Sequence, residues 1–450
     1  MESKLAQFAS LSQKDKAPAY LSLLPEILSR SNPSAIATDL HSLVDTVVNQ
    51  DSVGLVVGRQ VLSELVKSLG GGIIKDNELR KRIVEDTLAT VQPRITSYEE
   101  QVNSLRFQLA DLLEEDEEWS EAARVLMGIS LDSGQRTMPD EDKLRVYVRI
   151  VRLLLEDEDS VQAESYYNRA ALLVHSTSDK ETLLQFKLCQ ARISDYARKF
   201  LEAAMRYHEL SWVAEIDEEE RRHMLSAAVT CAVLAPAGPN RSRVLASLYR
   251  DERSAELPTY NILSKMFLDH ILRSAEVKDF EGTLKPHQLA IIAISSNDRL
   301  ASAIPDATAA NEPNTSTRTG PSTVLDRAVM EHNLLASSNI YNNITFRGLG
   351  ALLDLTPGAA ETMARKMIEQ GRLRGSIDQV DKLIWFQARD EDDAQGKAGG
   401  LGDVEQVTED TGAPFTKRWD MQIRTTAANV ESIVQHLTEK NLVKFASAAA

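Results

Sequence analysis

The side chains that most often carry catalysis or bind metals are present in this 450-residue chain, but not at the spacings such sites need. The sequence contains no His-x-His, His-Glu-x-x-His or Cys-x-x-Cys pattern of a zinc site. It also lacks the Gly-x-Ser-x-Gly nucleophile elbow and the glycine-rich phosphate loops. The eight histidines stand apart, at positions 41, 175, 208, 223, 270, 287, 332 and 436. We therefore expect no catalytic residue, no metal site and no bound cofactor.

Three features that could suggest chemistry have plainer interpretations. Gly70-Gly71-Gly72 is not followed by the Lys-Ser/Thr of a phosphate loop, so it is expected to join two helices. Cys189 and Cys231 lie within helical patterns and are expected to be buried free thiols in a reducing compartment. Glu331-His332 is expected on a helix in a solvent-facing or capping role, rather than as a metal ligand.

The bulk composition indicates a soluble intracellular protein of about three domains. The formal net charge is −16, from 51 basic and 67 acidic side chains, which disfavours binding to nucleic acid or to an anionic membrane. The first residues, Met1-Glu-Ser-Lys4, carry no apolar core of a signal peptide. The longest apolar run, Ala227–Ala235, is too short to span a bilayer.

A motif recurs about every forty residues in the middle of the chain. Glu121-Ala-Ala-Arg124, Gln162-Ala-Glu-Ser165 and Glu202-Ala-Ala-Met205 are offset by 41 and 40 residues. A single helix pair cannot bury its apolar face, whereas stacked pairs can, and small alanines let neighbouring helices approach closely. We predict a mainly α fold with a right-handed bihelical solenoid, similar to tetratricopeptide arrays, over residues 1–300.

Residues 323–388 have the outline of a winged helix, in which three helices are closed by a β-hairpin. Thr323-Val-Leu-Asp326 and Thr356-Pro357 predict two helix starts. Gly371 predicts a helix end, because glycine readily takes a left-handed conformation. Two apolar runs that follow, Ile377–Val380 and Leu383–Phe386, predict the hairpin strands.

Two segments are predicted to be flexible linkers because they hold too few apolar side chains to offset ordering entropy. The first, 303–322, is rich in Pro, Ala, Thr, Ser and Asn; the second, 389–414, is acidic and rich in glycine. The final segment, 415–450, predicts an amphipathic helix that enters a bundle with other chains or folds back. Its apolar stripe consists of Trp419, Ile423, Ala427, Val430, Val434 and Leu437.

A winged helix can read DNA or extend its sheet with another chain. The DNA hypothesis rests on a moderately basic third helix and its surroundings: Arg347, Arg365, Lys366, Arg372 and Arg374. The edge hypothesis rests on unpaired backbone groups of an outer strand, flanked by apolar surface. Its candidate interface residues are Ile377, Gln379, Ile384, Trp385 and Phe386, and the sequence does not divide them between core and contact.

Several segments give this chain a resemblance to the PCI-domain family, the scaffold subunits of the COP9 signalosome, the proteasome lid and the translation-initiation scaffold. The Glu-His-Asn of Leu325–Leu335 and the Asn-Ile-Thr-Phe of Tyr341–Phe346 resemble both the signalosome and the lid branches, whereas Ile377-Asp-Gln-Val380 resembles the signalosome branch more. The likeness covers roughly Ser104 to Phe386, and the two predicted linkers stand as insertions. The other matching segments are Ala235–Ala246, Tyr249–Arg253, Leu349–Leu353 and Gly375–Asp381.

The resemblance implies a non-catalytic scaffold of the COP9 signalosome, which removes a ubiquitin-like modifier from cullin-RING ligases. The implied partners are the other PCI subunits, the metalloprotease pair and the neddylated cullin-RING ligase, in cytoplasm and nucleus, with no membrane. The winged helix would join a ring of like domains, and the last helix would join a shared bundle. The alternatives are a PCI subunit of the proteasome lid and, less favoured, a winged-helix nucleic-acid-binding protein.

Overall fold

A computed structural model describes residues 13–292, 318–387 and 414–440, together with Leu5, Gln7 and Phe8. Within these ranges it leaves out residues 31, 51–52, 72–73, 75, 130 and 132–137. The described residues are mainly α-helical, as predicted, and they contain three short strands where the sequence predicted the two strands of a hairpin. They divide into two compact units, Met1–Arg221 and Arg222–Ala450, and the boundary falls within helix α12 (Glu218–Leu234).

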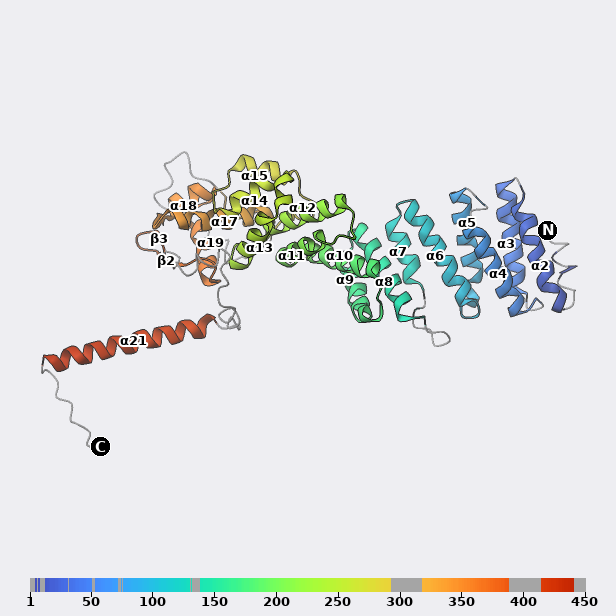
Figure 1. The fold of residues 1–450 in the computed structure, drawn as a ribbon, viewed down its shortest axis with the longest axis horizontal. Helices are drawn as coiled ribbons and strands as arrows, with labels where there is room; N and C mark the ends of the chain where they lie inside the picture. Colours follow the sequence, from blue (N-terminus) through green and yellow to red (C-terminus); the bar gives the residue numbers. More distant parts are fainter. Residues whose placement is uncertain are drawn as a thin grey trace, which may run out of the picture. The chain divides into compact units, whose positions relative to one another are not determined.

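The N-terminal unit is a succession of helices that pack against their neighbours in the sequence, as Figure 1 shows from α2 to α11. Its longer helices are α2 (Gln13–Leu28), α3 (Pro33–Asn49), α4 (Leu55–Gly70), α5 (Asn77–Val91), α6 (Glu99–Glu115), α7 (Trp119–Met127), α8 (Asp140–Glu156), α9 (Ser160–Ala171), α10 (Lys180–Tyr196) and α11 (Phe200–Ser211). Short 3₁₀ turns follow α5 and α9, at Gln92–Ser97 and Val174–Ser176.

The repeat is visible in the tight turns inside the helix pairs α6–α7, α8–α9 and α10–α11. Glu117, Glu158 and Arg198 occupy the same place in these turns and have φ of 60°, 62° and 60°. Non-glycine residues seldom adopt this left-handed conformation, and here it lets the chain reverse direction at a helix end. The next amide then closes each turn: Glu118 N–H, for example, donates to Leu113 C=O at 2.9 Å. The paired-helix repeat is therefore confirmed.

The repeated alanines lie where neighbouring helices meet. Ala122, Ala163 and Ala203 are fully buried, so a larger side chain at these positions would push two helices apart. Both cysteines are buried free thiols, as expected. Burial raises the pKa of the Cys189 thiol to about 11, so it stays protonated and unreactive at neutral pH.

Charged side chains connect consecutive repeats. Glu114 at the end of α6 accepts hydrogen bonds from Arg149 at 2.6 Å and Arg152 at 2.8 Å, both on α8. Glu156 at the end of α8 accepts one from Arg192 on α10 at 2.6 Å. The acidic ends of the first helices therefore fix the stacking of neighbouring repeats in addition to the apolar core.

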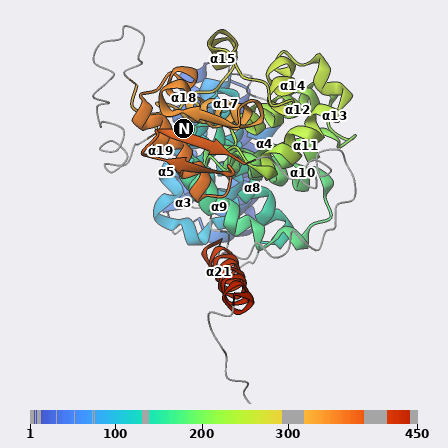
Figure 2. The same cartoon turned by 90° about the vertical axis from the view of Figure 1, so that its left-hand side faces the viewer.

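The C-terminal unit continues with short helices and ends in the winged helix. It contains α13 (Pro239–Arg250), a 3₁₀ turn (Glu252–Glu256), α14 (Tyr260–Phe267), α15 (Ser274–Glu281), α17 (Val324–Ile340), β1 (Asn343–Thr345), α18 (Phe346–Leu353), α19 (Pro357–Glu369), β2 (Gly375–Asp378), β3 (Leu383–Phe386) and α21 (Pro414–Glu439). Figure 2 shows α17, α18 and α19 grouped beside the strands. The sheet is antiparallel in the order β1-β3-β2.

The predicted helix boundaries of the winged helix follow from capping chemistry. Thr323 caps α17 by accepting from Asp326 N–H at 3.2 Å, and Thr356 caps α19 by accepting from Ala359 N–H at 3.3 Å. Gly371 follows the end of α19 with φ of 69°, which suits a residue without Cβ.

The predicted linkers lie mostly outside the described residues, at 303–317 and 389–413. Residues 318–322, the last part of the first predicted linker, are described and make contacts with neighbouring helices. Arg318 forms an ion pair with Asp326, and its C=O accepts from Thr356 N–H at 2.9 Å. These bonds hold the segment against the starts of α17 and α19.

Candidate protein-interaction site

Strand β2 forms an outer edge of the sheet and is the first part of the candidate site. Gln387 N–H donates to Arg374 C=O at 3.2 Å, which starts the alternating ladder between β3 and β2. In an antiparallel pair, every second residue directs its backbone groups away from the partner strand. The N–H and C=O of Gly375 and Ile377 therefore face the open edge, where a further strand could bond to them.

Two of the predicted interface residues belong to the core. Ile384 is 0% exposed, and Phe386 is also buried, in a cluster with Phe346, Leu349 and Met367. The prediction that Ile384 and Phe386 form a protein interface is therefore corrected. Alternate residues of a strand point to opposite faces, and these two point toward the helices of the winged helix.

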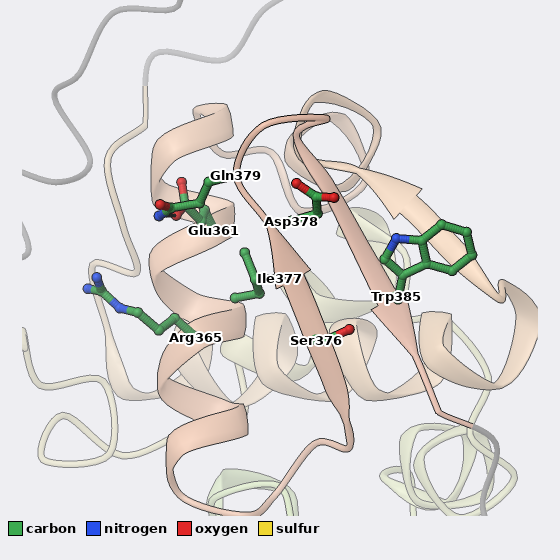
Figure 3. Close-up of a pocket in the computed structure, with 7 residues that line it drawn as sticks. All are labelled: Glu361, Arg365, Ser376, Ile377, Asp378, Gln379 and Trp385. Carbon is green, nitrogen blue, oxygen red and sulfur yellow. Dashed lines mark hydrogen bonds between the residues drawn. The ribbon is translucent and has the colours of Figure 1, made fainter. Parts of the chain in front are cut away.

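The other predicted edge residues remain accessible. Trp385 is 46% exposed, Gln379 is exposed, and Ile377 is half-buried against the core. In Figure 3, Ile377 lies between β2 and α19, whereas Trp385 points away from α19. An exposed tryptophan on a sheet supplies a large contact area at low entropic cost and is a common anchor of interfaces.

A groove with a volume of about 520 Å³ runs along β2 and is lined by both strand and helix residues (Figure 3). Glu361 and Arg365 contribute from α19, and Glu361 accepts a hydrogen bond from the Gln379 side chain at 2.6 Å. Glu361, Ser376 and Asp378 also line the groove and were not predicted from the sequence. Arg365 was predicted to contact DNA, although Glu361 and Arg365 stand one helical turn apart and would share one face of a helix.

The second part of the candidate site is α21. The described side chains of its predicted stripe, Ile423, Ala427, Val430 and Val434, are exposed, and Leu437 is half-buried. Ile433, which the predicted stripe omits, is exposed as well. Trp419 lies within α21, but its side chain is outside the described part of the structure. Large apolar side chains that are exposed along one helix indicate a protein-interaction surface.

A buried polar network positions the winged helix within the C-terminal unit. Glu331 on α17 is buried, and it accepts from Ala237 N–H at 3.1 Å and from Arg372 through both carboxylate oxygens. Arg372 also donates to Ala237 C=O at 3.3 Å. Three parts of the unit therefore meet at one carboxylate: the segment that precedes α13, helix α17 and the turn that follows α19. The expectation that Glu331-His332 faces solvent or caps a helix is wrong.

The two residues that follow Glu331 extend this network to the loop after α14. His332 is fully buried, and its Nε2 donates to His270 C=O at 2.9 Å. Its Nδ1 then accepts from Arg241 at 3.4 Å. Asn333 accepts from Leu272 N–H at 2.9 Å and donates to Leu272 C=O at 3.2 Å. The Glu-His-Asn sequence is thus a structural device, because Glu331 bonds to the backbone before α13, and His332 and Asn333 bond to the backbone of the loop after α14.

Arg241 is the most deeply buried cation of the network. It donates to Ala235 C=O at 3.2 Å, and burial lowers the pKa of its guanidinium to about 10. The nearby carboxylate of Glu331 raises that pKa and so supports the charge. A buried cation of this kind is stable only when hydrogen bonds and a nearby negative charge compensate for its lost hydration.

Two of the basic residues assigned to a DNA-reading helix have acidic partners within the winged helix. Arg372 is engaged by Glu331, and Arg365 lies within 3.8 Å of Glu369. Across the residues that the structure describes, no three His, Cys, Asp or Glu side chains come together as a metal site. The same residues form no helix long and apolar enough to cross a membrane.

Comparisons with known proteins match nearly the whole chain. A family model described as "PSMD12/CSN4, N-terminal" matches residues 3–219, and the PCI domain model matches residues 311–388. The COP9 signalosome complex subunit 4 of Drosophila melanogaster is 40% identical over 94% of this chain and 91% of its own length. Its Arabidopsis thaliana counterpart is 40% identical over 96% of both chains. The Emericella nidulans counterpart is 38% identical over 97% of both.

Proposed function

Because this chain belongs to the family of COP9 signalosome complex subunit 4, we propose that it is a non-catalytic scaffold subunit of that assembly. It supports the removal of the ubiquitin-like modifier from cullin-RING ligases by holding other subunits and sensing the modified ligase. The observation that carries the proposal is the identity of about 40% over almost the full length of several curated relatives.

The geometry of the winged helix supports a role in assembly. The edge of β2 offers backbone groups of Gly375 and Ile377 to a further strand, and Trp385 stands exposed beside it. A strand of a like domain would extend the sheet and seat its side chains in the groove along α19. The edge therefore suits a ring of PCI subunits.

The exposed stripe of α21 supports a second contact, with a helical bundle shared among subunits. The partners we propose are the other PCI subunits, the metalloprotease pair and the neddylated cullin-RING ligase. The proposed places of action are the cytoplasm and the nucleus. In this scheme the protease chemistry belongs to the partner that carries the zinc site.

A place in the proteasome lid is the second candidate, because the family model that matches residues 3–219 is shared by two proteins, PSMD12 and CSN4, and the winged-helix sequence resembles both the lid and the signalosome branches. The relatives matched over nearly their full length bear the signalosome name, which favours the first proposal. Nucleic-acid binding is less favoured, because Arg372 is held in an internal ion pair.

The contribution of α21 can be tested by substituting its exposed stripe. Ile423→Asp, Val430→Asp and Val434→Asp, combined in one tagged chain, are expected to reduce recovery of the other subunits at least about tenfold, because three charges cannot enter an apolar bundle. The measurement is quantitative mass spectrometry of the co-purified subunits. Thr425→Asp, Ala428→Asp and Ser432→Asp, on the opposite side of α21, form the matched control and should leave recovery unchanged. If the stripe variant co-purifies as much of the other subunits as the control variant does, α21 is not an assembly element.

A further inference from the structure

Helix α11 carries a mainly apolar stripe in which Met205 and Trp212 are exposed and Leu201 and His208 are half-buried. Leu201, Met205, His208 and Trp212 follow one another at steps of four, three and four residues, which places them on one face. Trp212, the residue that ends α11, is 61% exposed, and Met205 is exposed as well. At about 1.5 Å per residue the stripe is roughly 16 Å long, which is enough to contact three turns of another helix.

The neighbouring repeat presents an exposed apolar residue, Leu172, at the corresponding position. Leu172 precedes Trp212 by the same forty residues that separate the left-handed turns at Glu158 and Arg198. Leu172 is 82% exposed, so two successive repeats each end their second helix with a large apolar side chain in water. Equivalent positions of stacked repeats form a continuous surface. This surface, which we call the α11 face, consists of Leu172, Leu201, Met205, His208 and Trp212.

The Trp212 ring is held in place although it is exposed. Its indole N–H donates to Nε2 of His208 at 3.2 Å, and the two rings lie edge to face at 6.2 Å. A large aromatic side chain that is already ordered loses little entropy when a partner covers it. Tryptophan is also the residue type most enriched among the residues that dominate binding energies.

The charges around the α11 face differ at its two ends. Segment 212–220, at the Trp212 end, contains five carboxylates and no basic residue. Lys180 pairs with Glu215 at 2.9 Å, whereas Asp217, Glu218, Glu219 and Glu220 are exposed. The C-terminal end of α11 adds the negative end of its dipole. At the other end, Arg198 and Lys199 are exposed just before α11.

We propose that the α11 face binds an amphipathic helix of another polypeptide, with the basic end of that helix placed at Trp212. Apolar side chains of the partner cover Met205 and Trp212, and its lysines or arginines meet the carboxylates of segment 212–220. This adds to the proposed scaffold a second kind of partner on the helical repeats. It requires neither the β2 edge nor α21, so it can fail while the proposed assembly role stands.

The test uses the full-length chain and a fluorescein-labelled synthetic helix with leucine at every a and d position and lysine at the flanking positions. We expect saturable binding by fluorescence anisotropy, and at least about tenfold weaker binding after Trp212→Ala or Met205→Asp. Val56→Ala is the matched control, because Val56 is another exposed apolar residue, on α4, and its loss should not change the affinity.

A second peptide, with glutamate in place of lysine, tests the charge argument. This peptide is expected to bind at least about tenfold more weakly than the lysine peptide. In the double variant Glu218→Lys and Glu220→Lys, the affinities of the two peptides should differ less. Equal binding of the two peptides, or a change of less than twofold after both Trp212→Ala and Met205→Asp, would overturn the proposal. Circular dichroism of each variant confirms that its helices are intact.

Discussion

Replacement of Glu331 by alanine is expected to lower the free energy of unfolding of the C-terminal unit by about 3 kcal/mol. The carboxylate is buried, and its removal leaves the Arg372 guanidinium and the Ala237 N–H without their acceptor. The loss exceeds that of an ordinary hydrogen bond, because these donors cannot all be rehydrated inside the folded unit. The segment before α13 should loosen from α17 first.

Native-state hydrogen exchange is the direct measurement, because the amide of Ala237 reports the broken contact. We expect this amide and that of Leu272 to exchange faster in Glu331→Ala, since both are bonded to side chains of α17. Glu369→Ala is the control: Glu369 is 66% exposed beside Arg365, and its removal should cost no more than about 0.5 kcal/mol. A Glu331→Ala chain as stable as the control would show that the network does not hold the unit together.

The second large effect is expected at two adjacent strand residues that face opposite ways. Ile384→Asp should unfold the winged helix, at a cost of about 4 kcal/mol or more, because it places a carboxylate in the apolar core. Trp385→Asp should leave the fold intact, because Trp385 is already exposed. It should instead release the partner that pairs with the sheet.

These two variants are compared by circular dichroism, by limited proteolysis and by recovery of partner subunits. Ile384→Asp should show new cleavage within residues 323–387 together with loss of partners. Trp385→Asp should show loss of partners with the cleavage pattern of the unaltered chain. A folded Ile384→Asp chain would contradict the assignment of Ile384 to the core. Full recovery of partner subunits by the Trp385→Asp chain would show that Trp385 does not contribute to the interface.

The features that were predictable from sequence are those set by neighbouring residues. Thr323 and Thr356 cap helices with their own side chains, and Gly371 ends a helix by its own backbone freedom. The forty-residue repeat was likewise visible, because each helix pair is built from contiguous residues. The left-handed turn residues Glu117 and Arg198 were not foreseen, because the turn geometry imposes a conformation that these residue types do not favour.

The features that were not predictable depend on partners far along the chain. The carboxylate of Glu331 is satisfied from positions 94 residues before it and 41 residues after it, so its local sequence gives no sign of burial. In the run Leu383–Phe386, alternation separates two faces but does not say which face meets the helices. The structure supplies that choice, by placing Ile384 in the core and Trp385 in solvent.

The central claim is that this chain works as one part of a larger assembly, completed by other polypeptides. Native mass spectrometry of the tagged chain, purified gently from cells, tests it most directly. We expect a multi-subunit complex that contains PCI subunits together with the metalloprotease pair of the signalosome. Recovery of the chain as a monomer, or within the set of proteasome-lid subunits, would contradict the account.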